Sequence, residues 1–88
     1  MARVLIAYDE EEIIELLSLY LEKDGHCIYS AVNGLEALQI INNNEVDIAI
    51  IDIMMPQIDG YHLVRKIREN YDMPVIMLSA KRDRKSVV

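Results

Sequence analysis

Three nearly continuous apolar runs of strand length constrain this chain most. They read RVLIAY at residues 3–8, VDIAIID at 46–52 and VIML at 75–78. Short apolar runs without alternation are typical of strands buried on both faces, as in a parallel sheet covered by helices. A fourth, weaker strand is predicted for HCIYSA at 26–31. Strands of this kind must hide both faces, so helices are expected between them.

Apolar residues recur at helical spacing between the predicted strands. Gly25 is a suitable end for the first helix and Asn33 a suitable cap for the second. The residues expected to face the core are Ile13, Leu16, Leu17, Tyr20 and Leu21 in the first helix, Leu35, Leu38 and Ile41 in the second, and Leu63, Val64, Ile67 and Tyr71 in the third. Strands that alternate with helices predict an α/β fold with a doubly wound parallel sheet.

The composition limits the size of the molecule and its partners. The chain has 88 residues, 52% of them apolar, and a net charge of −6. We expect one small domain over residues 1–80, followed by a basic tail at 81–88. An acidic domain argues against direct nucleic-acid binding, which needs a basic surface. A single cysteine, Cys27, at the start of a strand expected to be buried, and the lack of a signal peptide or an 18-residue apolar stretch favour a cytoplasmic protein away from membranes.

Carboxylates follow two of the predicted strands. Asp9 and Glu10 come after the first strand, Asp52 ends the third, and Ser79 follows the fourth. In an open parallel sheet, ligands bind beyond the carboxyl ends of the strands, so these side chains are expected to converge if the first and third strands are neighbours. Clustered carboxylates suit Mg²⁺, and a carboxylate can also act as a nucleophile toward phosphorus.

Structural explanations exist for the same acids. Glu11, Glu12 and Glu15 are accounted for by the dipole at the start of a helix, where acids are favoured. Asp52 is explained equally well as a residue that begins a turn, because it precedes a loop containing Pro56. The sequence therefore leaves two interpretations of Asp52 open, a turn residue and a functional carboxylate.

Longer stretches resemble a known family. The chain is similar to the receiver domain of bacterial two-component response regulators in VLIAYDEEEI, SAVNGLEAL, VDIAIIDIMMPQIDGYHLVRKIR and MPVIMLSA. The pattern D-x-x-M-P-x-x-D-G, which runs from Asp52 to Gly60, is the most specific of these. The resemblance implies a flavodoxin-like, doubly wound parallel sheet, here shortened to four strands and three helices.

The resemblance also implies roles for individual residues. Asp52 would be the phosphoacceptor and Ser79 the switch hydroxyl that follows the phosphoryl group. Asp9 and Asp52 would hold Mg²⁺ together with the backbone carbonyl of Met54, and Glu10 is a secondary candidate ligand. The phosphodonor would be a sensor histidine kinase.

The chain departs from the family pattern in two ways. Tyr8 occupies a position where the family usually has an acid, and a phenol, with an ordinary pKa of about 10, brings no negative charge at neutral pH. The fifth strand and the lysine that follows it in the family have no counterpart here. We therefore expect the fourth strand to be an open sheet edge through which the chain self-associates.

Three functions are compatible with these residues. The first is a receiver fragment that accepts a phosphoryl group on Asp52 with Mg²⁺, a signalling module rather than an enzyme. The second is a degenerate receiver that is never phosphorylated and acts as an interaction element. The third is an aspartyl-phosphate phosphatase of the haloacid-dehalogenase type, although Met54 stands where such enzymes carry a second Asp.

Overall fold

The computed structural model describes residues 1–53 and 60–78 of the chain. Within these ranges, strands and helices alternate in the order that the sequence predicts. The elements are β1 (Arg3–Ala7), α1 (Glu11–Lys23), β2 (Cys27–Ala31), α2 (Gly34–Asn43), β3 (Ile48–Asp52), α3 (Gly60–Asn70) and β4 (Val75–Leu78).

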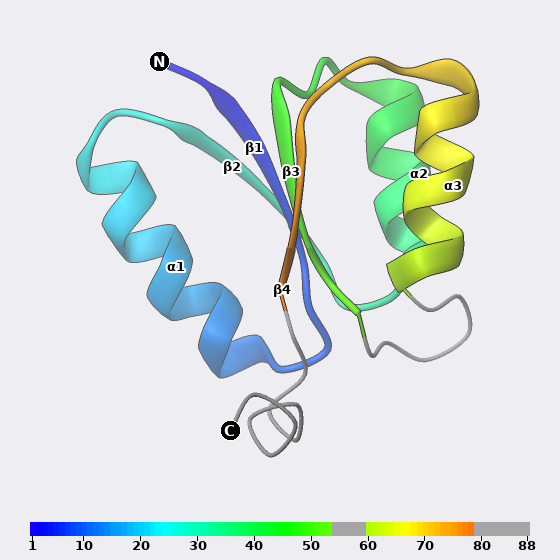
Figure 1. The fold of residues 1–88 in the computed structure, drawn as a ribbon. Coiled ribbons are helices and arrows are strands. Elements are labelled where there is room, and N and C mark those ends of the chain that lie inside the picture. Colours follow the sequence, from blue (N-terminus) through cyan, green and yellow to red (C-terminus); the bar gives the residue numbers. More distant parts are fainter. Residues whose placement is uncertain (54–59, 79–88) are drawn as a thin grey trace, which may run out of the picture.

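The strands form one parallel sheet with the order β2-β1-β3-β4. β1 lies between two partners, and Val4 is paired with Ile28 of β2 on one side and with Ile48 of β3 on the other. The chain thus winds from β1 toward one edge and then returns to continue on the other side of β1 (Figure 1). This confirms the predicted doubly wound α/β fold, and it places the switch in strand order between β1 and β3.

Helices cover the two faces of the sheet unequally. α1 packs alone on one face, against a cluster built on Val4, Ile6 and Ile14. α2 and α3 pack together on the other face, around Leu5 and Ile51 among others. Figure 1 shows the sheet between these two layers, with α1 on one side and α2 and α3 on the other.

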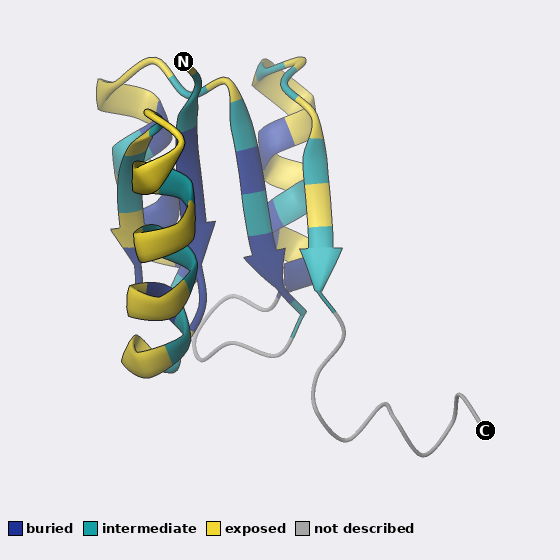
Figure 2. Cartoon of the chain, turned by 90° about the vertical axis from the view of Figure 1, so that its left-hand side faces the viewer, coloured by how far each residue is buried: buried dark blue, intermediate teal, exposed yellow. Residues whose placement is uncertain are grey.

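The α1 side of β3 and β4 is largely bare among the described residues. Figure 2 shows α1 in front of one half of the sheet and no described helix in front of β3 and β4. Ile48, Ile50 and Leu78 are only partly buried there, and Ile76 is exposed. The sheet therefore presents apolar side chains on this half of one face.

The buried stripe of α1 differs from the predicted one. Leu16 and Tyr20 are 51% and 65% exposed, although their spacing predicted a place in the core. Ile14 is buried instead, and Leu17 and Leu21 pack beside it as expected. α1 carries apolar residues around much of its circumference, so helical spacing alone fits two overlapping stripes, and only packing on the sheet selects between them.

The other two helices match their predictions more closely. Leu63 and Ile67 of α3 are buried as expected, and so is Ile41 of α2. Leu35 was predicted to face the core but is exposed, and the small side chain of Ala37 is buried instead. α2 therefore approaches the sheet through a smaller residue than its apolar spacing suggests.

Both predicted helix boundaries are confirmed. Gly25 has φ 89°, a left-handed conformation that glycine adopts without strain, and it follows the end of α1. The Asn33 side chain accepts a hydrogen bond of 2.9 Å from the backbone N–H of Glu36, and Glu36 Oε1 accepts one of 3.1 Å from Val32 N–H. This reciprocal arrangement is close to a capping box and fixes the start of α2.

β2 is an edge strand, and its exposure follows from that position. Cys27, expected at the start of a buried strand, is exposed. Within β2 only Ala31 is buried. The apolar pattern of a strand does not reveal whether it lies at the centre or the edge of a sheet, which explains why the prediction for Cys27 was wrong.

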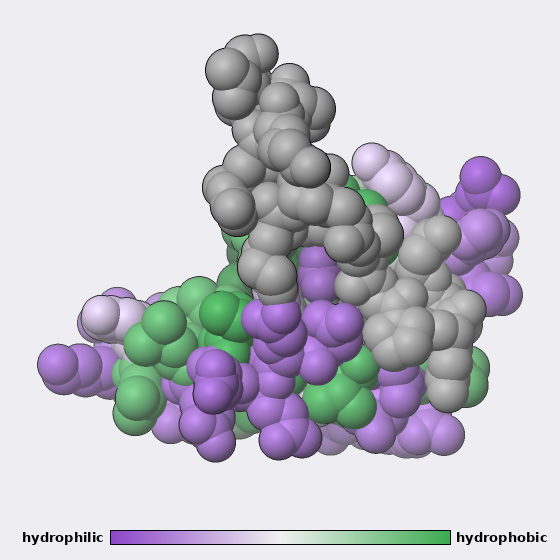
Figure 3. All heavy atoms as spheres, turned by 90° about the horizontal axis from the view of Figure 1, so that it is seen from below, coloured by the Kyte–Doolittle hydropathy of each residue, from purple (hydrophilic) through white to green (hydrophobic). Residues whose placement is uncertain are grey.

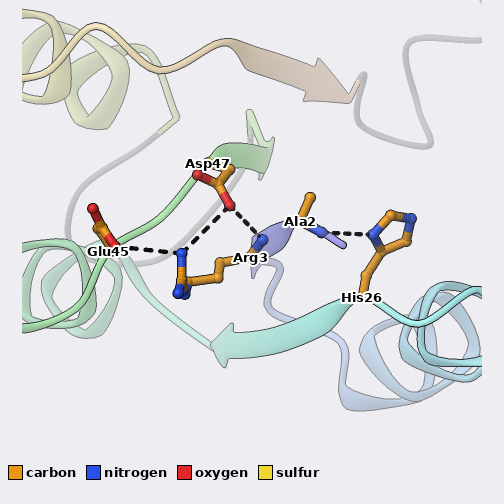
Figure 4. Close-up of polar contacts among 5 residues, drawn as sticks. All are labelled: Ala2, Arg3, His26, Glu45 and Asp47. Carbon is orange, nitrogen blue, oxygen red and sulfur yellow. Dashed lines mark hydrogen bonds and ion pairs between the residues drawn. The ribbon is translucent and has the colours of Figure 1, made fainter.

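Polar contacts fasten the amino-terminal end of β1 (Figure 4). The Arg3 N–H donates to Asp47 Oδ2 at 2.7 Å, and the Arg3 guanidinium lies 3.3 Å from a Glu45 carboxylate oxygen. On the other side, the Ala2 N–H donates to His26 Nδ1 at 3.0 Å. The residues that precede β3 and β2 thus hold the start of β1. This is the end of the sheet opposite to Asp9 and Asp52.

Candidate functional site

The carboxyl ends of β1 and β3 lie side by side. Ala7 is paired with Ile51, and the next residues along the two strands are Tyr8 and Asp52. Neighbouring strands are about 4.8 Å apart, so these two residues stand next to each other at the switch point of the sheet. From the sequence, the acids were expected to converge only if the first and third strands are neighbours. The sheet order meets that condition.

Asp52 is the buried charged residue of the described chain, with only 4% of its surface exposed. Its strand neighbour Ile51 points into the cluster under α2 and α3. Because side chains alternate along a strand, Asp52 faces the α1 side. The Ile53 N–H donates to the Leu78 carbonyl at 3.2 Å, so β3 stays attached to β4 just beyond Asp52. A carboxylate buried in this way is held in one place rather than free on a turn.

Gly60 lies against the backbone at the end of β3. Its N–H donates to the Ile53 carbonyl at 2.7 Å. A Cβ at Gly60 would lie 2.5 Å from the Asp52 carbonyl oxygen and 2.6 Å from the Ile53 Cα. The sequence indicated only a turn at Gly60, whereas the structure makes it the first residue of α3 and a backbone contact of the candidate phosphoacceptor.

Asp9 and Glu10 follow β1 at the same end of the sheet. Asp9 is exposed, and Glu10 is partly buried. The Glu10 carbonyl accepts the first hydrogen bond of α1, from Ile14 N–H at 3.2 Å. Glu11 and Glu12 lie exposed in the first turn, where the helix dipole favours acids. Of the two acids in the loop between β1 and α1, Asp9 is therefore the more exposed.

Tyr8 is part of the core on the α1 side. It is 8% exposed and belongs to the same cluster as Val4, Ile6 and Ile14. Its N–H donates to the Ala31 carbonyl at 3.0 Å, which continues the pairing of β1 with β2 by one residue. The aromatic ring is thus packed among apolar residues beside Asp52, at the position where the sequence led us to expect an acid.

The remaining predicted site residues, Met54 and Ser79, lie outside the described residues, as does Asp59. Within residues 1–53 and 60–78, no three His, Cys, Asp or Glu residues group closely enough to hold a metal ion. The candidate carboxylates in these ranges are Asp9, Asp52 and the secondary candidate Glu10. Figure 3 views this end of the molecule and shows hydrophilic and apolar residues interspersed, with an apolar group on the side of α1.

The fold and the site thus define a doubly wound α/β protein with a buried aspartate at the carboxyl end of a central strand. Comparison with known proteins identifies the family within that class. The model of the response regulator receiver domain matches residues 4–88. The chain belongs to this family.

The similar proteins agree with that assignment. The response regulator GtcR of Aneurinibacillus migulanus is 51% identical over 78 residues, which are 89% of this chain and 32% of GtcR. The chain thus spans about a third of that relative's length. A receiver domain of Francisella response regulator 1452 superposes with a TM-score of 0.87 at 37% identity, covering 98% of this chain and 72% of the other.

A second solved structure was determined with a ligand. The response regulator TrrA of Thermotoga maritima, in complex with Mg²⁺ and BeF, has a TM-score of 0.85 and 36% identity. The superposition covers 99% of this chain and 77% of TrrA. No helix in the described part of the present chain is long and apolar enough to cross a membrane.

Proposed function

We propose that this receiver domain accepts a phosphoryl group on Asp52 in two-component signal transduction, with a sensor histidine kinase as phosphodonor. The observation that carries the proposal is the burial of Asp52 at the switch point between β1 and β3, pressed against the first residue of α3. Membership of the family supports the same role. The proposed module is a cytoplasmic signalling component rather than an enzyme.

The chemistry of the proposal is a phosphoryl transfer to carboxylate. One oxygen of the Asp52 carboxylate forms a bond to phosphorus as the bond from phosphorus to the donor nitrogen breaks, and the donor imidazole retains the electron pair and takes up a proton. Ser79 would donate a hydrogen bond to a phosphoryl oxygen of the product. Because Asp52 is buried, its position is set before the donor arrives, which lowers the cost of orienting it.

The donor set suits a magnesium ion. Mg²⁺ takes oxygen ligands, commonly one or two carboxylates together with phosphate oxygens and water. The residues that would hold it are Asp9, Asp52 and the backbone carbonyl of Met54, with Glu10 as a further candidate. When bound, the ion would neutralise negative charge on the transferred group. With Tyr8 in the neighbouring position, this set has one carboxylate fewer than the usual family pattern, so weaker binding is expected.

A second function has support from one observation. Tyr8 is packed in the core directly beside Asp52, where it supplies no charge for a metal. This favours a degenerate receiver that is not phosphorylated and acts through its surfaces. An aspartyl-phosphate phosphatase is the least favoured function, since Met54 stands where that chemistry needs a second Asp.

Self-association through the sheet edge belongs to this second function. In the described part of the chain, β4 is paired only with β3, and its other edge is open to a further strand. The acidic composition opposes direct binding to nucleic acid by this chain. A lysine at position 76 would place a charge on the exposed face of β4, so Ile76→Lys should weaken pairing at that edge.

Intact mass spectrometry separates the phosphorylated receiver from the degenerate one. The chain is incubated with Mg²⁺ and a small phosphodonor, with Asp52→Asn as the matched control. Gain of one phosphoryl group that is absent from the control supports the proposed function. A wild-type mass that stays unchanged, while an authentic receiver is phosphorylated in the same mixture, would favour the degenerate receiver.

A further inference from the structure

The outer face of α1 exposes large apolar side chains. Leu19 is 66% exposed, and Leu16 and Tyr20 are exposed on the same helix. Figure 2 looks onto this face and shows it mostly exposed, with no other described element in front of it. Three large apolar residues together on one exposed helix face are a surface that favours association.

The spacing on this face is that of a helix pair. We call Glu12, Leu16, Leu19 and Lys23 the outer seam of α1, because they are separated by four, three and four residues. That is the spacing by which one helix keeps a single stripe toward another. Leu16, Leu19, Tyr20 and Lys23 also line a hollow of about 340 Å³. Four residues at these positions form the hole that receives one side chain of a facing helix.

The outer seam is complementary to itself when reversed. It begins with an acid, Glu12, continues with Leu16 and Leu19, and ends with a base, Lys23. In an antiparallel pair related by a two-fold axis, Glu12 lies level with Lys23 of the second copy, and Leu16 lies level with Leu19. We propose that α1 pairs antiparallel with α1 of a second copy of this chain, through the outer seam.

Helix dipoles, packing and ion pairs favour this arrangement, whereas the net charge and the small contact area limit its stability. Antiparallel helices place opposite ends of their dipoles together. Leu16 of the second copy enters the hollow described above, and the two ion pairs fix the register. The net charge of −6 opposes association, and a contact confined to one helix of 13 residues is small. The pair is therefore a weak, concentration-dependent dimer at the low end of interface sizes.

Charge exchange across the seam tests the proposal by sedimentation equilibrium up to millimolar concentration. The wild-type chain dimerises reversibly. Glu12→Lys or Lys23→Glu alone places like charges opposite each other twice, so each weakens the dimer by roughly three- to tenfold. The double variant regains the wild-type constant, and so does an equimolar mixture of the two single variants. Recovery in the mixture also shows that each variant is folded.

Controls separate this contact from other effects. Glu69→Lys and Lys66→Glu make the same charge changes on exposed positions of α3 and leave the dimer unchanged. Leu19→Glu abolishes it. A wild-type chain that is monomeric throughout overturns the proposal. It is also overturned if Ile76→Lys abolishes dimerisation and the seam variants do not, because the copies then pair through β4.

Discussion

The N–H of Gly60 donates a 2.7 Å hydrogen bond to the carbonyl oxygen of Ile53. The first residue of α3 thus lies against the backbone that immediately follows β3, although six residues separate the two in sequence. Because Ile53 directly follows Asp52, we expect this contact, together with the pairing of β3, to help fix the position of Asp52. We therefore expect a change at the start of α3 to alter the geometry of the candidate phosphoacceptor.

Gly60→Ala should damage both stability and the site. The added methyl group would meet the Asp52 carbonyl oxygen at 2.5 Å, and because that neighbour is backbone, the helix or the strand end must move. Overpacking of this kind costs about 1–3 kcal/mol. We expect a lower free energy of unfolding in urea and slower gain of the phosphoryl mass on Asp52.

Gly25→Ala provides the contrast for that variant. Gly25 has φ 89°, but no atom lies within 4 Å of its added Cβ. Only backbone strain is introduced, which costs about 1 kcal/mol at a site distant from the acids. Stability should fall while phosphorylation of the folded fraction stays as in the wild type. Equal effects of both variants on phosphorylation would show that the Gly60 contact does not position Asp52.

Tyr8→Asp should lower the stability of the metal-free protein and raise its affinity for Mg²⁺. The new carboxylate would stand among Val4, Ile6 and Ile14, and burying it without compensation costs at least about 1 kcal/mol. Mg²⁺ would offset that cost by binding the folded state. We expect a lower melting temperature without Mg²⁺, a larger rise on adding it than in the wild type, and tighter binding by calorimetry. Tyr8→Phe keeps the ring and should not gain affinity; an unchanged affinity of Tyr8→Asp would mean that the carboxylates do not assemble a metal site.

Asn33→Ala should destabilise the chain through α2. Asn33 Oδ1 accepts from the Glu36 N–H at 2.9 Å, and loss of such a cap costs about 0.5–2 kcal/mol. Glu36→Ala removes the reciprocal bond to Val32, so the two losses should be non-additive in a double-mutant cycle. Gln39→Ala changes an exposed side chain of the same helix and serves as the control in urea denaturation.

Asp47→Ala should cost more than Glu45→Ala, although both residues approach Arg3. Asp47 accepts a 2.7 Å bond from the Arg3 backbone N–H, and a hydrogen bond to a charged group contributes about 1.5–3 kcal/mol. The Glu45 side chain is 83% exposed and makes only a surface ion pair, which contributes about 0–1 kcal/mol. Denaturation at low and high salt should show a small, salt-sensitive loss for Glu45→Ala. The loss for Asp47→Ala should be larger and only partly salt-sensitive, because Asp47 Oδ2 accepts the backbone bond and also lies 4.0 Å from the Arg3 guanidinium. The reverse order would mean that the ion pair dominates.

Local sequence patterns predicted the fold well because each strand and helix has its own signal. The apolar runs identified the strands, and Asn33 and Gly25 marked helix boundaries that the structure confirms. The buried face of α1 was not predictable, since Leu16 and Leu17 suit the same apolar spacing and only the sheet decides between them. The exposure of Cys27 likewise depends on β2 being an edge strand, which is a property of the whole sheet.

The candidate site was predictable in outline. The strand ends that carry Asp9 and Asp52 were identified from the sequence, and the structure places those ends together. The backbone contact of Gly60 was missed, because a glycine in a turn motif has the same appearance whether it relieves strain or admits a neighbour. Tyr8 was noted as a missing acid, but its packing in the core depends on Ile14 of α1, which the sequence did not assign to the interior.

Because the chain is synthesised from its amino terminus, β1 emerges before the residues that hold it in place. β1 is synthesised before β2 and β3, yet it is fastened by residues that come much later: Ala2 to His26, 24 positions on, and Arg3 to Asp47, 44 positions on. At about 5–20 residues per second, roughly 2–9 seconds pass between synthesis of Arg3 and of its partner. During that interval β1, in which Val4 to Ala7 are all buried in the folded protein, has at most one neighbouring strand. The nascent chain is therefore most vulnerable to wrong pairing before β3 is complete.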